Sequence, residues 1–116
     1  MLSYVNLTRH PINLIVSGEE QVIPPSGEEA RVSQLPATPI NLQGISMPVF
    51  PPATYGPVTG LPAPAKGYAF IVSGLVAREV EGRADVFCPA TGPSDGALRN
   101  ERGHIKGVTR LRASGK

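Results

Sequence analysis

The proline-rich stretch of residues 33–66 restricts the fold more than any other feature. Eight of the thirteen prolines lie in it, and Lys66 is its only charged side chain. Proline has no backbone N–H to donate and fixes φ, so it is excluded from helix interiors and confined to the edges of sheets. Disordered segments combine low hydrophobicity with high net charge, and this stretch has neither. The sequence therefore predicts an ordered, extended wrap that lies along the domain or across a second subunit.

Within this stretch the pattern predicts two short edge strands and one turn. The strands are expected at residues 43–46 and 49–50, and the turn at residues 54–57 presents Tyr55. The ring of Tyr55 can stack on a planar ligand or cover the core, and the sequence leaves both roles open. A segment of this length with so little regular structure is normally functional or interfacial, which predicts a homo-oligomer.

The length of 116 residues predicts one domain, residues 1–116, with a single modest core. Thirteen glycines, thirteen prolines and only 5% aromatic residues favour many short strands and turns. No apolar run approaches eighteen residues and no signal-like segment opens the chain, so neither a membrane span nor secretion is expected. The single cysteine, Cys88, cannot form an internal disulfide and is compatible with a reducing cytoplasm.

The first third of the chain predicts a β-meander, because short apolar runs alternate with regularly spaced turn residues. Ile12, Leu14 and Val16 alternate along one run, so they are expected to share a buried face. Pro11 makes the interruption before this run a bend, which favours a structural role for His10 over a ligand or base. The expected strands are residues 4–7, 12–16, 21–23 and 28–32, with turns at residues 17–20 and 24–27.

The second half predicts a central strand, one short helix and a terminal hairpin. The apolar run at residues 68–72 has strand length, and Ser73 after it is a good N-cap. Val76 and Val80 lie four apart and should face the core, with Gly82 ending the helix. The expected strands are residues 83–89, 97–99 and 104–112, with a hairpin loop at residues 100–103. The fold class is therefore α+β: a small, mainly antiparallel β domain with one short helix and a C-terminal β-hairpin.

Basic residues gather at the C-terminal end of the chain. The net charge of +2 indicates no partner by itself, but from Ala97 onward there are six basic residues and one acid. A basic face on the last strand is either solvated or binds phosphate, and both roles stay open. The small excess of charge, with no interleaved aromatic residues, argues against nucleic acid. The expected packed face holds Ile105, Gly107, Thr109 and Leu111, and the expected basic face holds His104, Lys106, Val108, Arg110 and Arg112.

Few residues offer catalytic chemistry. Cys88 has no evident base beside it and is expected to be a small buried residue. The two Glu pairs, at residues 19–20 and 28–29, sit at turns and are expected to be solvated. Thr91 and Gly92 form either a simple turn or an anion-binding loop. No phosphate-loop lysine, dinucleotide glycine fingerprint or nucleophile elbow occurs, so no cofactor is expected and an enzyme is the weakest class.

Five segments together resemble a family of small phage and prophage proteins. Members typically open with an Asn-Leu-Thr-Pro-His signature and end with an arginine-acidic hairpin. This sequence has Arg9 where the signature has proline, which relaxes the backbone before His10. The segments that carry the resemblance span nearly the whole chain: VNLTRHPINLIV, IPPSGEEARVS, TYGPVTGLP, YAFIVSGLVAREVEGRADVFCPATGP and LRNERGHIKGV.

The chain is also similar to the Thoeris anti-defence sponge proteins, phage oligomers that sequester cyclic ADP-ribose-type signals of bacterial immunity and can hold cyclic oligonucleotides. This resemblance implies tight nucleotide binding without turnover, in the host cytoplasm, at sites on subunit boundaries. Cations for the phosphates and a surface for the base would be needed. The candidate ligand-binding residues are Tyr55, Arg83, Thr91, Arg99 and Arg110. A small phage structural or assembly protein with no small-molecule ligand is the alternative.

Overall fold

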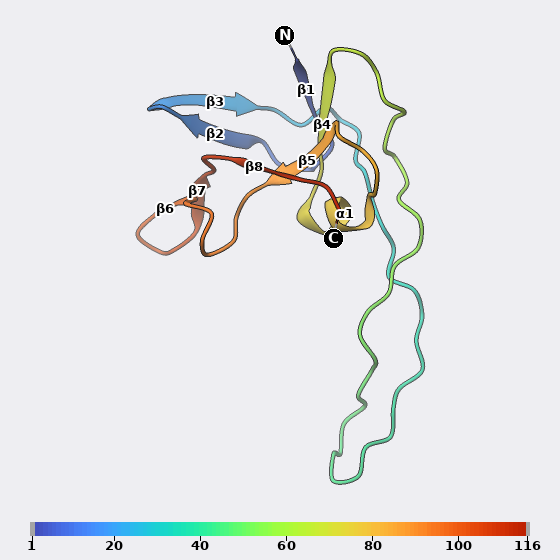
Figure 1. The fold of residues 1–116 in the computed structure, drawn as a ribbon. Helices are drawn as coiled ribbons and strands as arrows, with labels where there is room; N and C mark the ends of the chain where they lie inside the picture. Colours follow the sequence, from blue (N-terminus) through green and yellow to red (C-terminus); the bar gives the residue numbers. More distant parts are fainter. Residues whose placement is uncertain (1, 116) are drawn as a thin grey trace.

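Eight short strands and one short helix make up the regular structure of residues 2–115, the part of the chain that the computed structural model describes (Figure 1). This content confirms the predicted α+β class. In chain order the elements are β1 (Ser3–Asn6), β2 (Ile12–Val16), β3 (Glu19–Ile23), β4 (Tyr68–Ile71), α1 (Gly74–Glu79), β5 (Val86–Pro89), β6 (Leu98–Arg99), β7 (Ile105–Gly107) and β8 (Leu111–Ala113).

The central sheet has the strand order β1-β4-β5-β8. β4 pairs in parallel with β1 and with β5, and β8 is antiparallel to β5. The predicted central strand is confirmed, and its near-continuous apolar sequence is typical of a strand that is covered on both faces. The predicted meander is wrong for the first strand, because β1 pairs with β4, more than sixty residues away, instead of with its neighbour in sequence. In the first third of the chain, β2 and β3 are the consecutive strands that pair with each other.

The β2-β3 hairpin turns through two residues, Ser17 and Gly18, with φ values of 52° and 79°. Two successive positive φ values match the right-handed twist of the flanking strands. Ile12 and Ile23 face each other at the buried end of this hairpin. Val16 is 51% exposed at the other end, which corrects the prediction that it belongs to the core. The hairpin projects beyond the central sheet, so only its base can be covered.

The C-terminal hairpin is shorter than its sequence pattern predicts. β6 and β7 pair around the expected loop, which confirms a hairpin there. The predicted second strand, residues 104–112, is wrong because it breaks at Val108: that side chain is buried against β2, and β8 then leaves to pair with β5. Burial of one apolar side chain therefore divides the expected basic face between two sheets.

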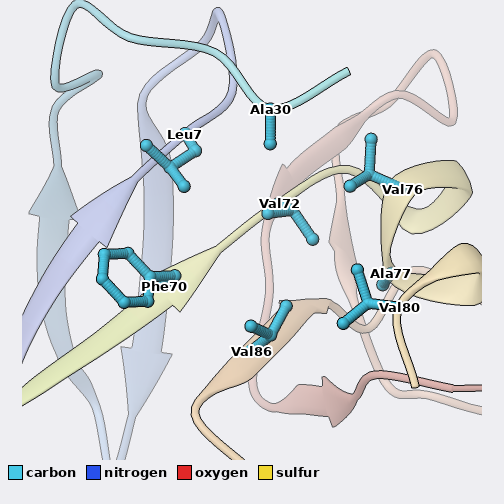
Figure 2. Close-up of a cluster of buried hydrophobic side chains, with 8 residues drawn as sticks. All are labelled: Leu7, Ala30, Phe70, Val72, Val76, Ala77, Val80 and Val86. Carbon is cyan, nitrogen blue, oxygen red and sulfur yellow. The ribbon is translucent and has the colours of Figure 1, made fainter. Parts of the chain in front are cut away.

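Hydrophobic side chains form a core on each face of the central sheet. On one face α1 packs over β4 and β5, and Figure 2 shows Val76 and Val80 directed toward Val72 and Val86. The backbone N–H of Val76 donates to Ser73 Oγ at 3.3 Å, which confirms the predicted N-cap. The opposite face carries the smaller cluster of Ile12, Ile23, Ile71 and Val108.

A long arm, residues 31–59, leaves the domain as two extended segments that run side by side (Figure 1). Backbone pairing is limited to three places: Arg31 with Thr59, Gln34 with Tyr55, and Ile40 with Val49. The prediction of ordered, extended chain is confirmed, but the arm does not lie along its own domain. Two local predictions are wrong. Residues 43–44 form the turn at the tip instead of a strand, and Tyr55 lies in extended pairing instead of a turn.

The bend after β1 is built around Asn6, which is 1% exposed. Its Nδ2 donates to the carbonyl oxygens of His10 at 2.8 Å and Ile23 at 3.0 Å. Its Oδ1 accepts from the backbone N–H of Thr8 at 2.9 Å and from Thr8 Oγ1 at 2.6 Å. Both amide donors and both acceptor positions are therefore occupied. His10 contributes its carbonyl to this bend, in agreement with the structural role predicted for it.

Candidate functional site

The five predicted ligand-binding residues do not form one cluster. Tyr55 lies on the arm opposite Gln34. Arg83 lies just before β5, and Thr91 just after it. Arg99 ends β6, and Arg110 precedes β8. Only Thr91, Arg99 and Arg110 come from segments that contact one another.

Arg83 is occupied by partners within its own chain. Its Nε and Nη2 donate to the two carboxylate oxygens of Asp85 at 2.8 and 2.9 Å, and Nη2 also donates to the Pro62 carbonyl at 3.0 Å. The hydrogen bond from Arg83 lowers the pKa of Asp85 despite partial burial, and the same bond raises the pKa of Arg83. The arginine thus ties the returning end of the proline-rich stretch to the start of β5, which is a structural task.

Thr91 and Arg99 are brought together by the β6-β7 hairpin. Arg99 Nη1 donates to the Gly103 carbonyl at 2.9 Å, and its Nη2 reaches the Thr91 carbonyl at 3.5 Å. The N–H of Ala90 donates to the Arg110 carbonyl at 3.1 Å, so Arg110 flanks the same loop through its backbone. Arg99 and Arg110 are both exposed residues.

The loop after β5 already holds an internal anion, Asp95. Gly92 donates its N–H to Asp95 Oδ2 at 2.9 Å, and Arg112 forms an ion pair with Asp95 Oδ1. These two partners, Arg112 first, hold the pKa of the buried Asp95 carboxyl below its usual range. The Gly92 N–H that made this loop a candidate anion site is therefore bound to Asp95. Arg112, which the alternating pattern placed on a free basic face, is also engaged there.

A cleft with a volume of about 400 Å³ lies beside Thr91, between the bend before β2 and strand β7. Three hydrogen bonds fix its two walls. Val108 N–H donates to the Asn13 carbonyl at 2.8 Å, and Ile15 N–H donates to the Val108 carbonyl at 2.8 Å. Asn13 Nδ2 donates to the Lys106 carbonyl at 3.2 Å. We call this the β2–β7 cleft. Its lining residues are Thr8, His10, Pro11, Ile12, Asn13, Pro89, Thr91, Ile105, Lys106, Gly107 and Val108.

The polar groups of the β2–β7 cleft are basic or neutral. Lys106 and His10 are its ionisable lining residues, and no carboxylate is among the lining residues that the structure describes. Arg99 pairs with Ile105 in the hairpin, and it lines a neighbouring surface hollow with Asn100, Glu101, Arg102 and Lys106. This hollow has three basic residues and one acid, so the surface beside the cleft favours anions on balance. The alternation of apolar and basic residues identified Lys106 as part of a basic face. It could not predict that His10 lines the same cleft.

A second cavity of about 400 Å³ lies between α1 and the base of the arm, and its two arginines share one carboxylate, Glu29. Glu29 accepts from Arg9 Nε at 2.5 Å and from Arg31 Nε at 2.6 Å. The prediction of a solvated carboxylate is therefore wrong for Glu29, whose side chain is 21% exposed. Arg9, the departure from the Asn-Leu-Thr-Pro-His signature, has a structural partner here.

Glu29→Gln is expected to lower the melting temperature at neutral pH but not in acid. Hydrogen bonding by Arg9 lowers the pKa of Glu29 in the folded state, and the charge of Arg31 adds to this effect. A carboxyl with a lowered folded pKa stabilises the protein above its unfolded pKa and loses that effect as the pH falls through the folded value. Thermal unfolding of both proteins between pH 7 and pH ~3 should show the difference shrink below pH ~4.

Glu20→Gln serves as the control for this experiment, since Glu20 is exposed on β3. Its melting temperature should follow the wild type at every pH. A Glu29→Gln difference that persists unchanged into acid would show that charge pairing is not its source.

Cys88 fits the structural role that the sequence predicts. It packs against the core cluster beneath α1, and burial raises the pKa of its thiol. Among residues 2–115 there is no group of three His, Cys, Asp or Glu side chains placed to hold a metal ion. Nor does that part of the chain contain a helix with the length and apolar character needed to cross a membrane.

Comparisons with the models of known protein families, with curated proteins and with solved structures found no match to this chain. The geometry of the molecule is thus the basis for a functional proposal.

Proposed function

We propose that this chain is a non-catalytic binding protein that sequesters a small phosphorylated ligand, of the cyclic nucleotide class, in the β2–β7 cleft. The observation that supports the proposal is the composition of the cleft wall: Lys106 and His10 line a nucleotide-sized space with no carboxylate among its described lining residues. Ligand sites of this size combine an apolar wall with a few polar groups that fix orientation.

The residues of the cleft divide the work of binding a nucleotide. Lys106 offers a phosphate three N–H donors, and Arg99 at the neighbouring hollow adds a guanidinium. Pro11, Pro89 and Ile105 supply apolar surface for a base or ribose. Of the five residues predicted to bind a ligand, Thr91 is among the lining residues of the cleft, whereas Tyr55 and Arg83 are not.

Binding without turnover is the chemistry that these side chains favour. Catalysis needs a nucleophile and a base in mutual reach, or two groups whose environments drive their pKa values apart. The described cleft residues offer one ammonium, one imidazole, one side-chain amide and two hydroxyls, and the Thr8 hydroxyl already donates to Asn6. Signal sequestration in the host bacterial cytoplasm, as the resemblance to anti-defence sponges implies, is the corresponding biological role.

The test is to incubate the purified protein with cyclic ADP-ribose isomers and with cyclic di- and trinucleotides, remove unbound material, and heat the protein. Mass spectrometry of the released fraction should recover one of these ligands intact. A chemically altered product would indicate an enzyme instead, and an empty fraction with every ligand would overturn the proposal.

Lys106→Ala is expected to weaken binding of the ligand recovered in that experiment by at least roughly tenfold, because a charge-assisted phosphate contact is worth about 1.5–3 kcal/mol. Titration calorimetry provides the dissociation constant. Lys66→Ala removes the same charge from an exposed residue next to β4 and is the matched control. Equal losses in the two variants would mean that net charge, not the cleft, governs binding.

A structural or assembly protein remains the second candidate, because the arm exposes apolar side chains that a solitary binding domain does not need. Co-purification of the protein with phage particles from infected cells would single out this role. Its absence from particles, together with intact ligand recovery, would support sequestration.

A further inference from the structure

The arm is the most apolar exposed part of the molecule. Its charged residues are confined to its base, since none occurs between Arg31 and Lys66. Met47, near the tip, is 70% exposed. Monomeric proteins rarely present so continuous an apolar surface to water. Of the large hydrophobic residues that are exposed in residues 2–115, six belong to the arm: Leu35, Ile40, Leu42, Ile45, Met47 and Phe50.

Contacts within the arm are too few to hold it in this shape alone. Its two segments pair at three isolated places, and a two-stranded ribbon is marginally stable in water even with a full ladder. Prolines limit the conformations of both segments and reduce the entropy lost on docking. Residues 40–47, at the tip, contain no proline, so each of them has a backbone N–H. Those of Ile40 and Ile45 donate within the arm, to the carbonyls of Val49 and Leu42, and the others can be donated to a partner.

A complementary surface lies at the free edge of the central sheet. A groove of about 790 Å³ runs between β1 and the end of β3, and we call it the β1–β3 groove. None of its described lining residues is charged, and Leu2, Tyr4 and Val22 in it are exposed. Its lining residues are Leu2, Ser3, Tyr4, Gln21, Val22, Ile23 and Pro24.

The edge of β1 also offers backbone groups to an added strand. Ser3 N–H donates to the Gly67 carbonyl and Leu7 N–H to the Ile71 carbonyl, both at 2.8 Å. In a parallel pair these alternate residues point toward the partner strand, so the N–H and carbonyl of Tyr4 point outward. Addition of an extended peptide as a further strand is one way in which such an edge binds a partner.

The groove and the arm of one chain lie too far apart to meet in this conformation. Figure 1 shows the tip of the arm at one end of the molecule and the N-terminus, with β1, near the other, and the molecule is 56 Å long. We propose that the arm of one copy docks, through residues 40–47, in the β1–β3 groove of a second copy. Reciprocal docking gives a closed, two-fold symmetric dimer.

A second copy is the occupant that these observations favour over a different protein. The proposed contact joins the tip of the arm, an uncharged apolar peptide, to the β1–β3 groove, an uncharged apolar groove beside a strand edge. Every chain carries one of each, so the two surfaces are always present in equal number. In a two-fold symmetric dimer both arm-in-groove contacts form together, which doubles the contact area gained in one association event. This proposal concerns a surface distinct from the β2–β7 cleft and does not depend on a nucleotide.

The experiment measures mass in solution by native mass spectrometry and by light scattering over a range of concentrations. Wild type should be a dimer. The double variant Ile45→Glu with Met47→Glu places charges on the docking segment of the arm, and Val22→Glu places one in the groove. Each should weaken dimerisation by roughly a hundredfold, because a buried unpaired charge is costly. Leu75→Glu changes an exposed apolar residue outside both surfaces and is the control.

Mixing the arm variant with the groove variant is the decisive step. One intact arm and one intact groove are present in each mixed pair, so the mixture should form a heterodimer that neither variant matches alone. Circular dichroism of each variant checks that the domain is folded. A monomeric wild type at every concentration, or a dimer that survives both charged variants, would overturn the proposal, as would failure of two folded variants to complement each other.

Discussion

Asn6→Ala is expected to lower the free energy of unfolding by about 4 kcal/mol, one of the two largest effects that we predict for a single substitution. The side chain makes four buried or partly buried hydrogen bonds, which join the His10 and Ile23 carbonyls to Thr8. Each bond contributes about 1 kcal/mol, and each polar group left unpaired in the interior costs about 1–3 kcal/mol. Urea unfolding followed by circular dichroism measures the loss.

Asn13→Ala is the matched control, because Asn13 makes a single exposed bond of 3.2 Å to the Lys106 carbonyl. We expect a loss of about 1 kcal/mol or less from that bond. Thr8→Val should fall between the two variants, since it removes one hydroxyl from the network and keeps the Asn6 amide. If Asn6→Ala and Asn13→Ala had equal effects, the buried amide would not be what holds the bend.

The role of Asn6 also changes the interpretation of the opening sequence. Asn6, Leu7 and Thr8 form part of the pattern that carries the resemblance to phage proteins. In the structure Asn6 and Thr8 bond to each other, and Leu7 is fully buried in the core. The pattern therefore specifies a bend and a core position. A resemblance based on these three residues supports a shared fold more directly than a shared ligand.

Local signals in the sequence predicted the elements that depend on neighbouring residues. The Ser73 cap, the buried pair Val76 and Val80, and the apolar strand before them require only nearest-neighbour chemistry. Sheet partners were not predictable in this way. β1 pairs with β4 across the whole proline-rich stretch, and alternation of apolar residues contains no information on which distant strand will be the neighbour.

The candidate site illustrates the same limit. Alternation treated residues 104–112 as one strand, but the second hydrophobic cluster draws Val108 inward and ends that strand after Gly107. The glycine-containing loop marked Thr91 as a candidate anion-binding residue. His10 could not, because β2 meets β7 through contacts between residues more than ninety positions apart, such as Asn13 and Lys106.

Ion pairs were the least predictable feature. Arg31, one partner of Glu29, lies two positions after it, but the other partners are distant: Arg9 lies twenty positions before Glu29, and Arg112 seventeen after Asp95. Both carboxylates are covered once the chain folds. A carboxylate at a turn in the sequence can thus bind a distant arginine in the folded protein, so neither Glu29 nor Asp95 is a free charge.

Gly60→Ala is expected to lower the free energy of unfolding by about 3 kcal/mol and to loosen the arm at its base. Gly60 has a φ of 80°, and a Cβ there would lie 2.3 Å from the Glu29 carbonyl oxygen. Backbone must move to relieve this contact, since no flexible side chain is involved. The adjacent pair, Arg31 and Thr59, exchanges two hydrogen bonds of 2.8 and 2.9 Å that such a movement would disrupt.

Gly27→Ala separates the two causes of this loss. Gly27 also has a positive φ, 96°, but a Cβ there would meet no heavy atom within 4 Å. It should therefore show only the cost of a side chain in the left-handed region, about 1–2 kcal/mol. Urea unfolding provides both energies, and limited proteolysis should cut the arm faster in Gly60→Ala alone. Equal stability and equal cleavage of the two variants would mean that the close approach of Gly60 to Glu29 does not anchor the arm. If the close approach does anchor it, Gly60→Ala should also weaken dimerisation, because an arm with a loosened base loses the fixed direction that docking in a second copy requires.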